Sequence, residues 1–143
     1  MIEDILITPQ KIIETPEGDV MHAMKVHDLG YVNFGEAYFS IINSFGIKAW
    51  KRHKEMTLNL VVPFGKVKFV LYDDRKYKDG IFQVHVISKD NYSRLTVPPM
   101  IWMGFQGLSD DNSMILNIAD IKHNPKEVDK KNINEIEFNW SKE

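Results

Sequence analysis

Residues 56–62, MTLNLVV, carry the pattern that decides the fold. In this stretch, apolar Leu58 and Leu60 alternate with polar Thr57 and Asn59. Such a two-residue period is typical of a β-strand whose faces meet two different environments. The stretch runs into a Pro-Phe-Gly sequence that favours a turn. We therefore predict a strand that ends at this turn.

Short runs of the same kind recur along the chain, and segments rich in Gly, Pro, Asp and Asn separate them. The runs cover residues 19–25, 35–42, 66–73, 81–87, 93–97 and 113–119. The separating segments are residues 43–46, 63–66, 73–80, 88–91 and 108–113. Many short strands with turns at this spacing, and no convincing long helix, indicate an all-β antiparallel barrel or jelly roll.

The composition is that of one globular domain. The chain has 143 residues and a formal charge of -2, with 43% hydrophobic residues. This length predicts a single domain over residues 1–143, and this hydrophobic content is enough for a core. After Ala119 the sequence becomes polar and charged. We expect a surface-wrapping tail over about 120–143, with Phe138 and Trp140 docked in a hydrophobic slot of the barrel or of a partner subunit.

Several classes of function and location are disfavoured. A nearly balanced charge cannot neutralise a row of phosphates, so we expect no nucleic-acid partner. The chain has no cysteine, which excludes disulfides and thiolate chemistry, and its acidic start does not resemble a secretory signal. The longest stretch without a charged residue, residues 95–109, contains two prolines and falls short of the ~20 apolar residues of a membrane helix. We expect a cytoplasmic protein with no membrane partner.

The densest polar cluster is GIKAWKRHKEMTLNL, residues 46–60. Together with GDVMHAMK, FGEAYFSII, VVPFGKVKFVLYDDR, NYSRLTVPPMIWMGFQGL and IKHNPKE, it resembles the nucleotide-sugar epimerase branch of the cupins in order and spacing. This is the family of dTDP-4-dehydrorhamnose 3,5-epimerase. The resemblance runs from about Gly18 to Glu127 and implies a cupin jelly-roll barrel, the double-stranded β-helix.

The resemblance also implies a reaction. The family substrates are nucleoside-diphosphate 4-keto-hexoses, and the chemistry is proton transfer at the carbons next to the ketone. We therefore expect a metal-independent epimerase of surface-polysaccharide biosynthesis, with no cofactor. Two alternatives stay open. One is a 3,4-ketoisomerase of dTDP-4-keto sugars, because His53 and Lys54 match the end of an H-x-H-K motif, and the other is a cupin that binds the sugar nucleotide without turnover.

The family motif assigns the catalytic candidates. Lys48 falls at the family Arg, Lys51 at the first His and His53 at the second His. We predict His53 as the acid/base, since imidazole titrates near neutral pH. Lys51 is predicted as a cation beside the developing oxyanion, or as the base if its surroundings depress its pKa. The hydroxyl of Tyr38, on a neighbouring strand in the family order, is either the missing acid or the exposed tip of a core aromatic residue.

The other candidates are predicted to bind the substrate. Lys48 and Arg52 fit a diphosphate, because Arg offers forked hydrogen bonds and Lys a point charge. Trp102 follows a Pro-Pro turn and either stacks on the nucleotide base or packs in the core. Asn59 is a polar residue on the alternating strand, and Arg75 matches a family letter. Without the resemblance, the cation cluster is more typical of a solvated strand edge.

The same alignment bears on metal binding. Metal-binding cupins resemble His, His, Glu and His where this chain has Lys51, His53, Leu58 and Met103. One imidazole cannot hold a transition metal, so we predict no metal in this pocket. The histidines outside the motif are predicted to be structural or to lie on the surface: His22, His27, His85 and His123.

Two partners are expected. The first is a small nucleotide-sugar substrate, as the resemblance implies. The second is another copy of the chain, because barrels of this family exchange edge strands. The segment ILITPQKII, residues 5–13, reads as an apolar strand without a hairpin partner of its own. We therefore expect a homodimer.

Overall fold

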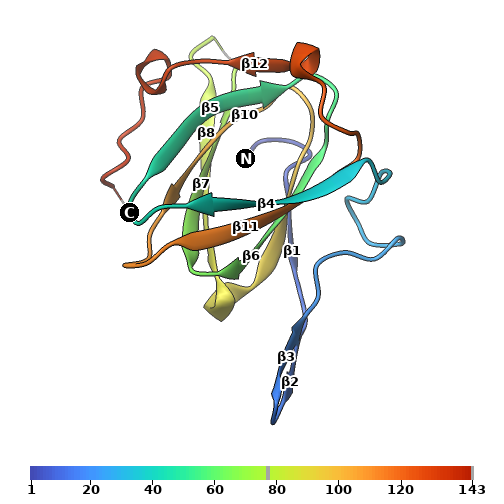
Figure 1. The fold of residues 1–143 in the computed structure, drawn as a ribbon. Coiled ribbons are helices and arrows are strands. Elements are labelled where there is room, and N and C mark those ends of the chain that lie inside the picture. Colours follow the sequence, from blue (N-terminus) through green and yellow to red (C-terminus); the bar gives the residue numbers. More distant parts are fainter. Residues whose placement is uncertain (77, 143) are drawn as a thin grey trace.

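The computed structural model describes residues 1–76 and 78–142, which form two five-stranded antiparallel sheets and a separate hairpin (Figure 1). The sheets face each other, as in a jelly roll, so the predicted all-β cupin fold class is confirmed. Tyr77, in the predicted turn at 73–80, and Glu143, at the end of the predicted tail, lie outside the described residues. Within the described residues, no helix has the length and apolar character to cross a membrane.

The first sheet has the strand order β1-β9-β6-β11-β4. Its strands are β1 (Leu6–Pro9), β9 (Ser93–Val97), β6 (Leu58–Phe64), β11 (Ser113–Ala119) and β4 (Glu36–Ile42). The second sheet has the order β12-β5-β10-β7-β8. Its strands are β12 (Val128–Lys130), β5 (Ile47–His53), β10 (Trp102–Gly107), β7 (Lys66–Asp73) and β8 (Ile81–Ser88).

The remaining elements are short. Strands β2 (Ile12–Thr15) and β3 (Gly18–Met21) pair as a hairpin that projects away from the barrel (Figure 1). Single 3-10 turns occur at η1 (Lys89–Asn91), η2 (Pro125–Glu127) and η3 (Ile133–Glu135). The predicted strands over 66–73, 93–97 and 113–119 are found with these bounds, whereas β5 and β10 have no counterpart among the predicted runs.

The N-terminal segment differs from the prediction. It divides into β1, which pairs with β9 of the same chain, and β2, which pairs with β3. The expectation that this segment lacks a hairpin partner is therefore wrong. The predicted strand over 19–25 is shorter in the structure, where it forms the second arm of this hairpin.

Apolar side chains from both sheets fill the space between them. The alternation in the deciding stretch predicts one core face and one more polar face, yet residues 58–62 are buried on both faces. On the outer face, Asn59 Nδ2 donates to the carbonyl of Gly30 at 3.0 Å, and its Oδ1 accepts from the Thr96 hydroxyl at 2.6 Å. Gly30 has φ +89°, and a Cβ there would lie 2.6 Å from Thr96 Oγ1. The loop thus lies directly against β6 and β9.

The C-terminal segment covers the outer face of the second sheet. Trp50 and Trp102 from that sheet form a second apolar cluster with Ile136 and Trp140 from the segment. The ring centroids of Trp50 and Trp140 lie 5.4 Å apart. Trp140 therefore docks on the barrel of its own chain.

A buried lysine fastens this segment. Lys68 on β7 is 1% exposed, and its ammonium group donates to the carbonyls of Trp140 at 2.9 Å and Lys142 at 2.7 Å. A buried ammonium group must have hydrogen-bond acceptors, and here the end of the chain supplies them. Lys68 therefore couples the docking of the segment to the second sheet.

Replacing Lys68 by Met should lower the free energy of unfolding by about 1–3 kcal/mol, because two carbonyls lose a charged donor. Urea denaturation measures this change. Lys66→Met, on an exposed position of the same strand, is the matched control and should change stability by less than about 0.5 kcal/mol. Equal effects of the two substitutions would contradict the anchoring role of Lys68.

Candidate active site

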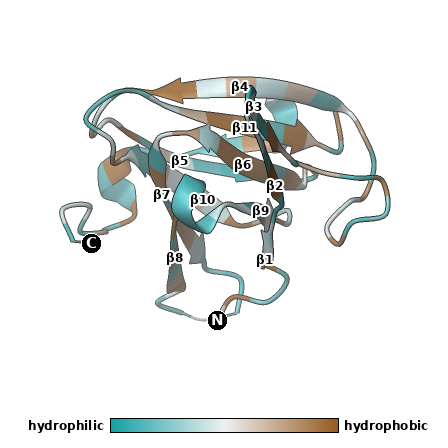
Figure 2. Cartoon of the chain, turned by 90° about the horizontal axis from the view of Figure 1, so that it is seen from below, coloured by the Kyte–Doolittle hydropathy of each residue, from teal (hydrophilic) through white to brown (hydrophobic). Residues whose placement is uncertain are grey.

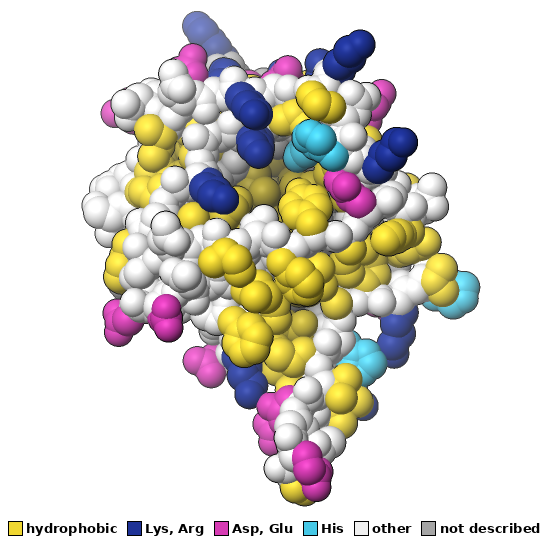
Figure 3. Space-filling model, viewed as in Figure 1, with side chains coloured by type: hydrophobic (Ala, Val, Ile, Leu, Met, Phe, Trp, Pro, Cys, Tyr) yellow, Lys and Arg dark blue, Asp and Glu magenta, His cyan; other side chains and the backbone are white. Residues whose placement is uncertain are grey.

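A cavity of about 260 Å³ opens between the two sheets. Figure 3 shows it as a recess with an apolar interior, and Lys and His side chains stand around its rim. Its apolar lining comes from Met56, Leu58, Leu60, Phe69, Val97, Pro98, Ile101, Met103, Phe105, Ile115, Pro125 and Val128. Its polar lining comes from Tyr38, Ser40, Lys48, Lys51, His53, Asn117, His123 and Lys130. No carboxylate appears in this lining of described residues.

A bulge in β5 decides which motif residues face the cavity. Lys51 is opposite Met103 of β10 and Lys48 is opposite Phe105, so two residues of β5 face the single Gly104. A Cβ on Gly104 would lie 2.7 Å from the Cβ of Ala49, which makes glycine the residue that allows this approach. Because of the extra residue, Lys48 and Lys51 both line the cavity although they are three positions apart.

His53, at the end of β5, pairs with a buried carboxylate. Its Nδ1 lies 2.6 Å from Oε1 of Glu127, which is 3% exposed. A carboxylate only accepts hydrogen bonds, so Nδ1 carries the proton and Nε2 is left as the basic nitrogen. No described residue makes a hydrogen bond to Nε2. The pair thus presents a histidine in the tautomer that a general base requires.

Glu127 is held as a carboxylate by its donors. Its Oε2 accepts from the backbone N–H groups of Lys54 at 3.0 Å and Glu55 at 3.3 Å. Burial is the largest single influence and raises the pKa of Glu127, but the hydrogen bonds from His53 and from these amides outweigh it. The pKa of Glu127 therefore lies below its usual value near 4.5.

Strand β12 brings a further cation to the cavity. It pairs antiparallel with β5, and this register places Lys130 opposite Lys51 and Val128 opposite His53. Partial burial, together with the positive charges of Lys130 and Lys48, lowers the pKa of Lys51. Three lysines therefore gather at one wall, and none of them has an ion-pair partner among the described residues.

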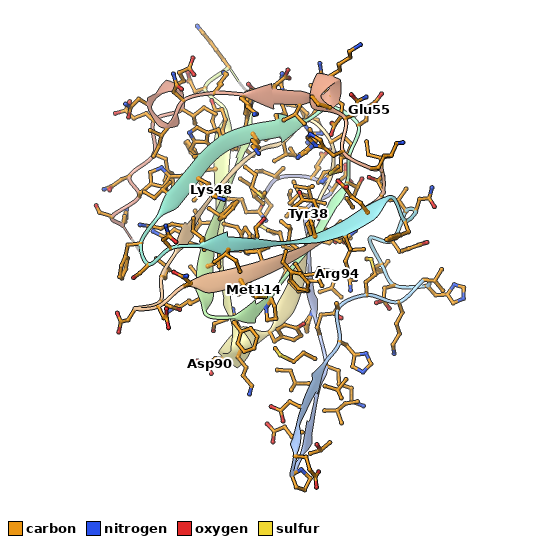
Figure 4. The ribbon with its side chains drawn as sticks, in the orientation of Figure 1. Tyr38, Lys48, Glu55, Asp90, Arg94 and Met114 are labelled. Atoms are coloured by element: carbon orange, nitrogen blue, oxygen red, sulfur yellow. The ribbon has the colours of Figure 1, made fainter. Side chains whose placement is uncertain are left out.

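Tyr38 approaches from the first sheet. It is opposite Asn117 in the β4-β11 pairing, and its hydroxyl accepts a hydrogen bond from Asn117 Nδ2 at 3.1 Å. Figure 4 shows Tyr38 on β4 and Lys48 on β5, and both side chains line the cavity between these strands. A hydroxyl that accepts from Asn117 still has its own proton to donate. The two sheets thus supply different polar groups to one space.

Four of the predicted site residues line this cavity, and the structure places the other four away from it. Tyr38, Lys48, Lys51 and His53 are brought together. Arg52 points to the opposite face of β5, where its Nη2 donates to Asp129 at 2.7 Å. Its guanidinium group lies 4.6 Å from the ring centroid of Trp102.

The other three predicted site residues that lie away from the cavity are Trp102, Asn59 and Arg75, and each makes contacts that stabilise the fold. Trp102 is 2% exposed and belongs to the cluster under the C-terminal segment, since the inward position on β10 is Met103. Asn59 bonds the loop over β6, as described above. Arg75 forms two hydrogen bonds with the carboxylate of Asp73 at 2.9 and 3.0 Å, within the same turn.

Sequence reasoning did not assign five polar groups to the site, namely Ser40, Asn117, His123, Glu127 and Lys130. His123 was expected to be structural or on the surface; it is exposed, and it also lines the cavity. Asn117 had a usable signal, because it is the one amide on the alternating strand 113–119. Glu127 and Lys130 lie in the charged tail, and only the pairing of β12 with β5 brings them to the motif.

The described residues contain no group of three or more His, Cys, Asp and Glu side chains that could hold a metal ion. Lys51, Leu58 and Met103 all line the cavity beside His53, where metal-binding cupins would carry ligands. An ammonium group, a leucine and a thioether do not complete a transition-metal site around one imidazole.

Two curated proteins are similar to the chain in sequence. The chain is 27% identical over 100 residues to the "Probable low-salt glycan biosynthesis epimerase Agl13" of Haloferax volcanii, covering 68% of this chain and 64% of the relative, which is less than two thirds of its length. It is 30% identical over 118 residues to the "Spore coat polysaccharide biosynthesis protein SpsL" of Bacillus subtilis, covering 78% of each. No family model matches the chain.

A solved structure is similar over nearly the whole chain. The crystal structure of a dTDP sugar isomerase from Desulfovibrio desulfuricans G20 superposes with a TM-score of 0.92 at 32% sequence identity. The match covers 97% of this chain and 92% of that one. At this coverage and identity, the fold and the sequence both indicate that the chain is related to that isomerase.

Glu127→Gln should lower the free energy of unfolding by about 1–3 kcal/mol at pH 7, because charge-assisted hydrogen bonds become neutral ones. The folded state lowers the pKa of Glu127, so this stabilisation is complete above its usual value near 4.5 and is lost as the pH falls through the lower folded value. Urea titrations from pH 3 to pH 7 should therefore show the two proteins converging at acidic pH.

Glu55→Gln removes one exposed negative charge from the same turn and is the matched control. It should change stability at pH 7 by less than about 0.5 kcal/mol. A stability difference for Glu127→Gln that stays constant down to pH 3 would show that the carboxylate charge does not contribute.

Proposed function

The chain belongs to the dTDP-sugar isomerase and epimerase family of cupin-fold proteins, and we propose that it epimerises a nucleoside-diphosphate 4-keto-hexose. The reaction removes a proton from a carbon next to the ketone and returns one to the other face. The product would enter the synthesis of a surface polysaccharide, in keeping with the names of the two curated relatives, which give glycan biosynthesis for one protein and spore coat polysaccharide biosynthesis for the other.

One observation carries this proposal. The cavity combines a histidine oriented by a buried carboxylate, a tyrosine hydroxyl and three lysines, and none of the described lining residues is an acid. An enolate intermediate needs a base, a proton donor and positive charge beside the oxygen. His53, Tyr38 and Lys51 match these needs in that order.

The remaining cations suit the rest of the substrate. Lys48 and Lys130 stand on neighbouring strands without carboxylate partners among the described residues, so they are available to a diphosphate. This assignment replaces Arg52, whose guanidinium group is already bound to Asp129. The apolar part of the cavity then receives the less polar face of the sugar or nucleoside.

The 3,4-ketoisomerase alternative uses the same first step. Removal of the proton at C3 gives an enediol that can return with the ketone at C3 instead of C4. The single histidine on β5, His53, falls at the second histidine of the H-x-H-K motif, and this match is the reason to test the ketoisomerase alternative. A sugar-nucleotide-binding protein without turnover is the third possible outcome.

Incubation with dTDP-4-keto-6-deoxyglucose in D2O, followed by NMR, distinguishes these reactions. We expect deuterium at C3 or C5, and His53→Asn should lower its incorporation by about 100-fold or more, as for loss of a general base. His27→Asn changes an exposed histidine outside the cavity lining and should exchange at the wild-type rate.

Each alternative has its own signature in this experiment. Migration of the ketone to C3 identifies the isomerase, and binding without exchange identifies the non-catalytic protein. Wild-type exchange by His53→Asn would overturn the assignment of the base.

The surface of the first sheet supports a homodimer. Its edge strand β4 exposes Phe39 by 62% and Ile41 by 46%. Figure 2 shows apolar bands along this strand, and in Figure 3 hydrophobic side chains gather below the recess and continue toward the β2-β3 hairpin. An edge strand with exposed apolar side chains is a typical site for pairing with another chain. We propose that a second copy covers this face.

Phe39→Lys should therefore convert a dimer into a monomer, because a charge on this apolar face cannot be buried without a partner. Light scattering at micromolar concentration measures the mass. Val84→Lys, at an exposed apolar position on edge strand β8 of the other sheet, is the matched control and should remain dimeric. A monomeric wild-type protein would overturn the proposal.

A further inference from the structure

Lys51 lines the cavity in surroundings that diphosphate binding does not fully explain. It stands between Met103 of β10 and Lys130 of β12, with Lys48 on the same wall. No acidic side chain is found in the described lining, and no ion pair to Lys51 occurs among the described residues. Lys48 and Lys130 already supply two positive charges for a diphosphate. A third lysine at this position is free for another task.

The surroundings of Lys51 make its ammonium group easier to deprotonate than that of an isolated lysine. Partial burial is the main cause of its lowered pKa, and the charges of Lys130 and Lys48 act in the same direction. A lysine beside other cations and apolar side chains is the usual setting for an amine that attacks a carbonyl. The substrate class of the proposed function provides a carbonyl, the ketone at C4.

We propose that Lys51 forms a Schiff base with the ketone of the substrate. The inference rests on the proposed function and replaces the purely electrostatic role of Lys51 by a covalent one. Nζ attacks C4 as the neutral amine, a C–N bond forms, and with one proton taken up from solvent the ketone oxygen leaves as water. The resulting protonated imine withdraws electrons from C3 and C5 more strongly than the ketone does.

The rest of the cycle uses groups already in the cavity. His53 Nε2 takes the proton from the adjacent carbon, and the electron pair moves into the imine to give an enamine. Tyr38 or water returns a proton to that carbon. Water then adds to C4, and the C–N bond breaks to release the ketone and the free amine. This hydrolysis returns to solvent the proton that was taken up when the imine formed, and no oxidant or reductant is required.

The spacing of Lys51 and His53 supports this division of work. They are two residues apart on one face of β5, which separates their Cα atoms by about 7 Å. The long lysine side chain and the imidazole can therefore approach two bonded carbons of one ligand, the ketone carbon and its neighbour. The buried Glu127 fixes the imidazole while the amine reaches the carbonyl.

Chemical trapping tests the inference. The protein is incubated with dTDP-4-keto-6-deoxyglucose and sodium cyanoborohydride, which reduces a protonated imine to a stable secondary amine. Peptide mass spectrometry should then locate the sugar nucleotide on Lys51. In parallel, substrate labelled with 18O at the ketone should lose its label to water at a rate that depends on Lys51.

Lys51→Arg keeps the positive charge but cannot form an imine. We expect it to abolish the adduct and to lower both label loss and deuterium incorporation by about 100-fold or more. Lys66→Arg, an exposed lysine outside the cavity lining, is the control and should behave as the wild type. Circular dichroism establishes that each variant is folded.

The outcomes separate this inference from the function on which it rests. Deuterium incorporation by the wild type without an adduct and without loss of 18O would overturn the Schiff base and leave the epimerase or isomerase intact. Deuterium incorporation by Lys51→Arg at the wild-type rate would also overturn the Schiff base and leave the epimerase or isomerase intact. No exchange and no adduct with any 4-keto nucleotide sugar would overturn both. An adduct confined to Lys51, with loss of exchange in Lys51→Arg, supports the covalent mechanism.

Discussion

The buried carboxylate of Glu127 is the contact on which both the site and its surroundings depend. One oxygen bonds the imidazole of His53, and the other bonds the amides that follow β5. The same residue leads directly into β12, which pairs along β5 and carries Lys130 to the cavity. Burial opposes the charged form of Glu127, and its donors outweigh that cost. The tautomer of the base and the position of the last strand are therefore coupled.

Charge is distributed unevenly between the two faces of β5. On the cavity face, Lys48 and Lys51 have no carboxylate partners among the described residues. On the opposite face, Arg52 is bound to Asp129 and lies over Trp102. The inner face is thus left with positive charge that an anionic ligand can neutralise. An amine that repels its neighbours in this way is also easier to deprotonate, so binding and nucleophilic chemistry can follow from one arrangement.

Two buried cations hold long segments on the outside of the barrel. Lys68 bonds carbonyls at the end of the C-terminal segment, and Arg94 bonds the carbonyls of Ala23 and Leu29 in the loop over the first sheet. Each cation is almost fully buried and obtains its acceptors from backbone that has no regular partner. The apolar surface around β4 has no such cover among the described residues. That difference makes this face the candidate for contact with a second copy.

The sequence by itself determined the strand-rich fold, the turns and the resemblance to the epimerase branch of the cupins. These depend on local signals, such as the alternation in residues 113–119 and the turn residues between strands. The motif also identified Lys48, Lys51 and His53, which the structure brings to one cavity with Tyr38.

Only the tertiary structure decided which face of β5 each motif residue occupies and which tail residues complete the site. The bulge opposite Gly104 turns Lys48 inward against a simple alternation, whereas Arg52 lies on the outer face beside Trp102 of β10. Glu127 is 74 positions from His53 in the chain, and β12 joins β5 by long-range pairing. Local sequence patterns do not specify such pairing, because the register of the two strands is set by hydrogen bonds and packing between distant segments.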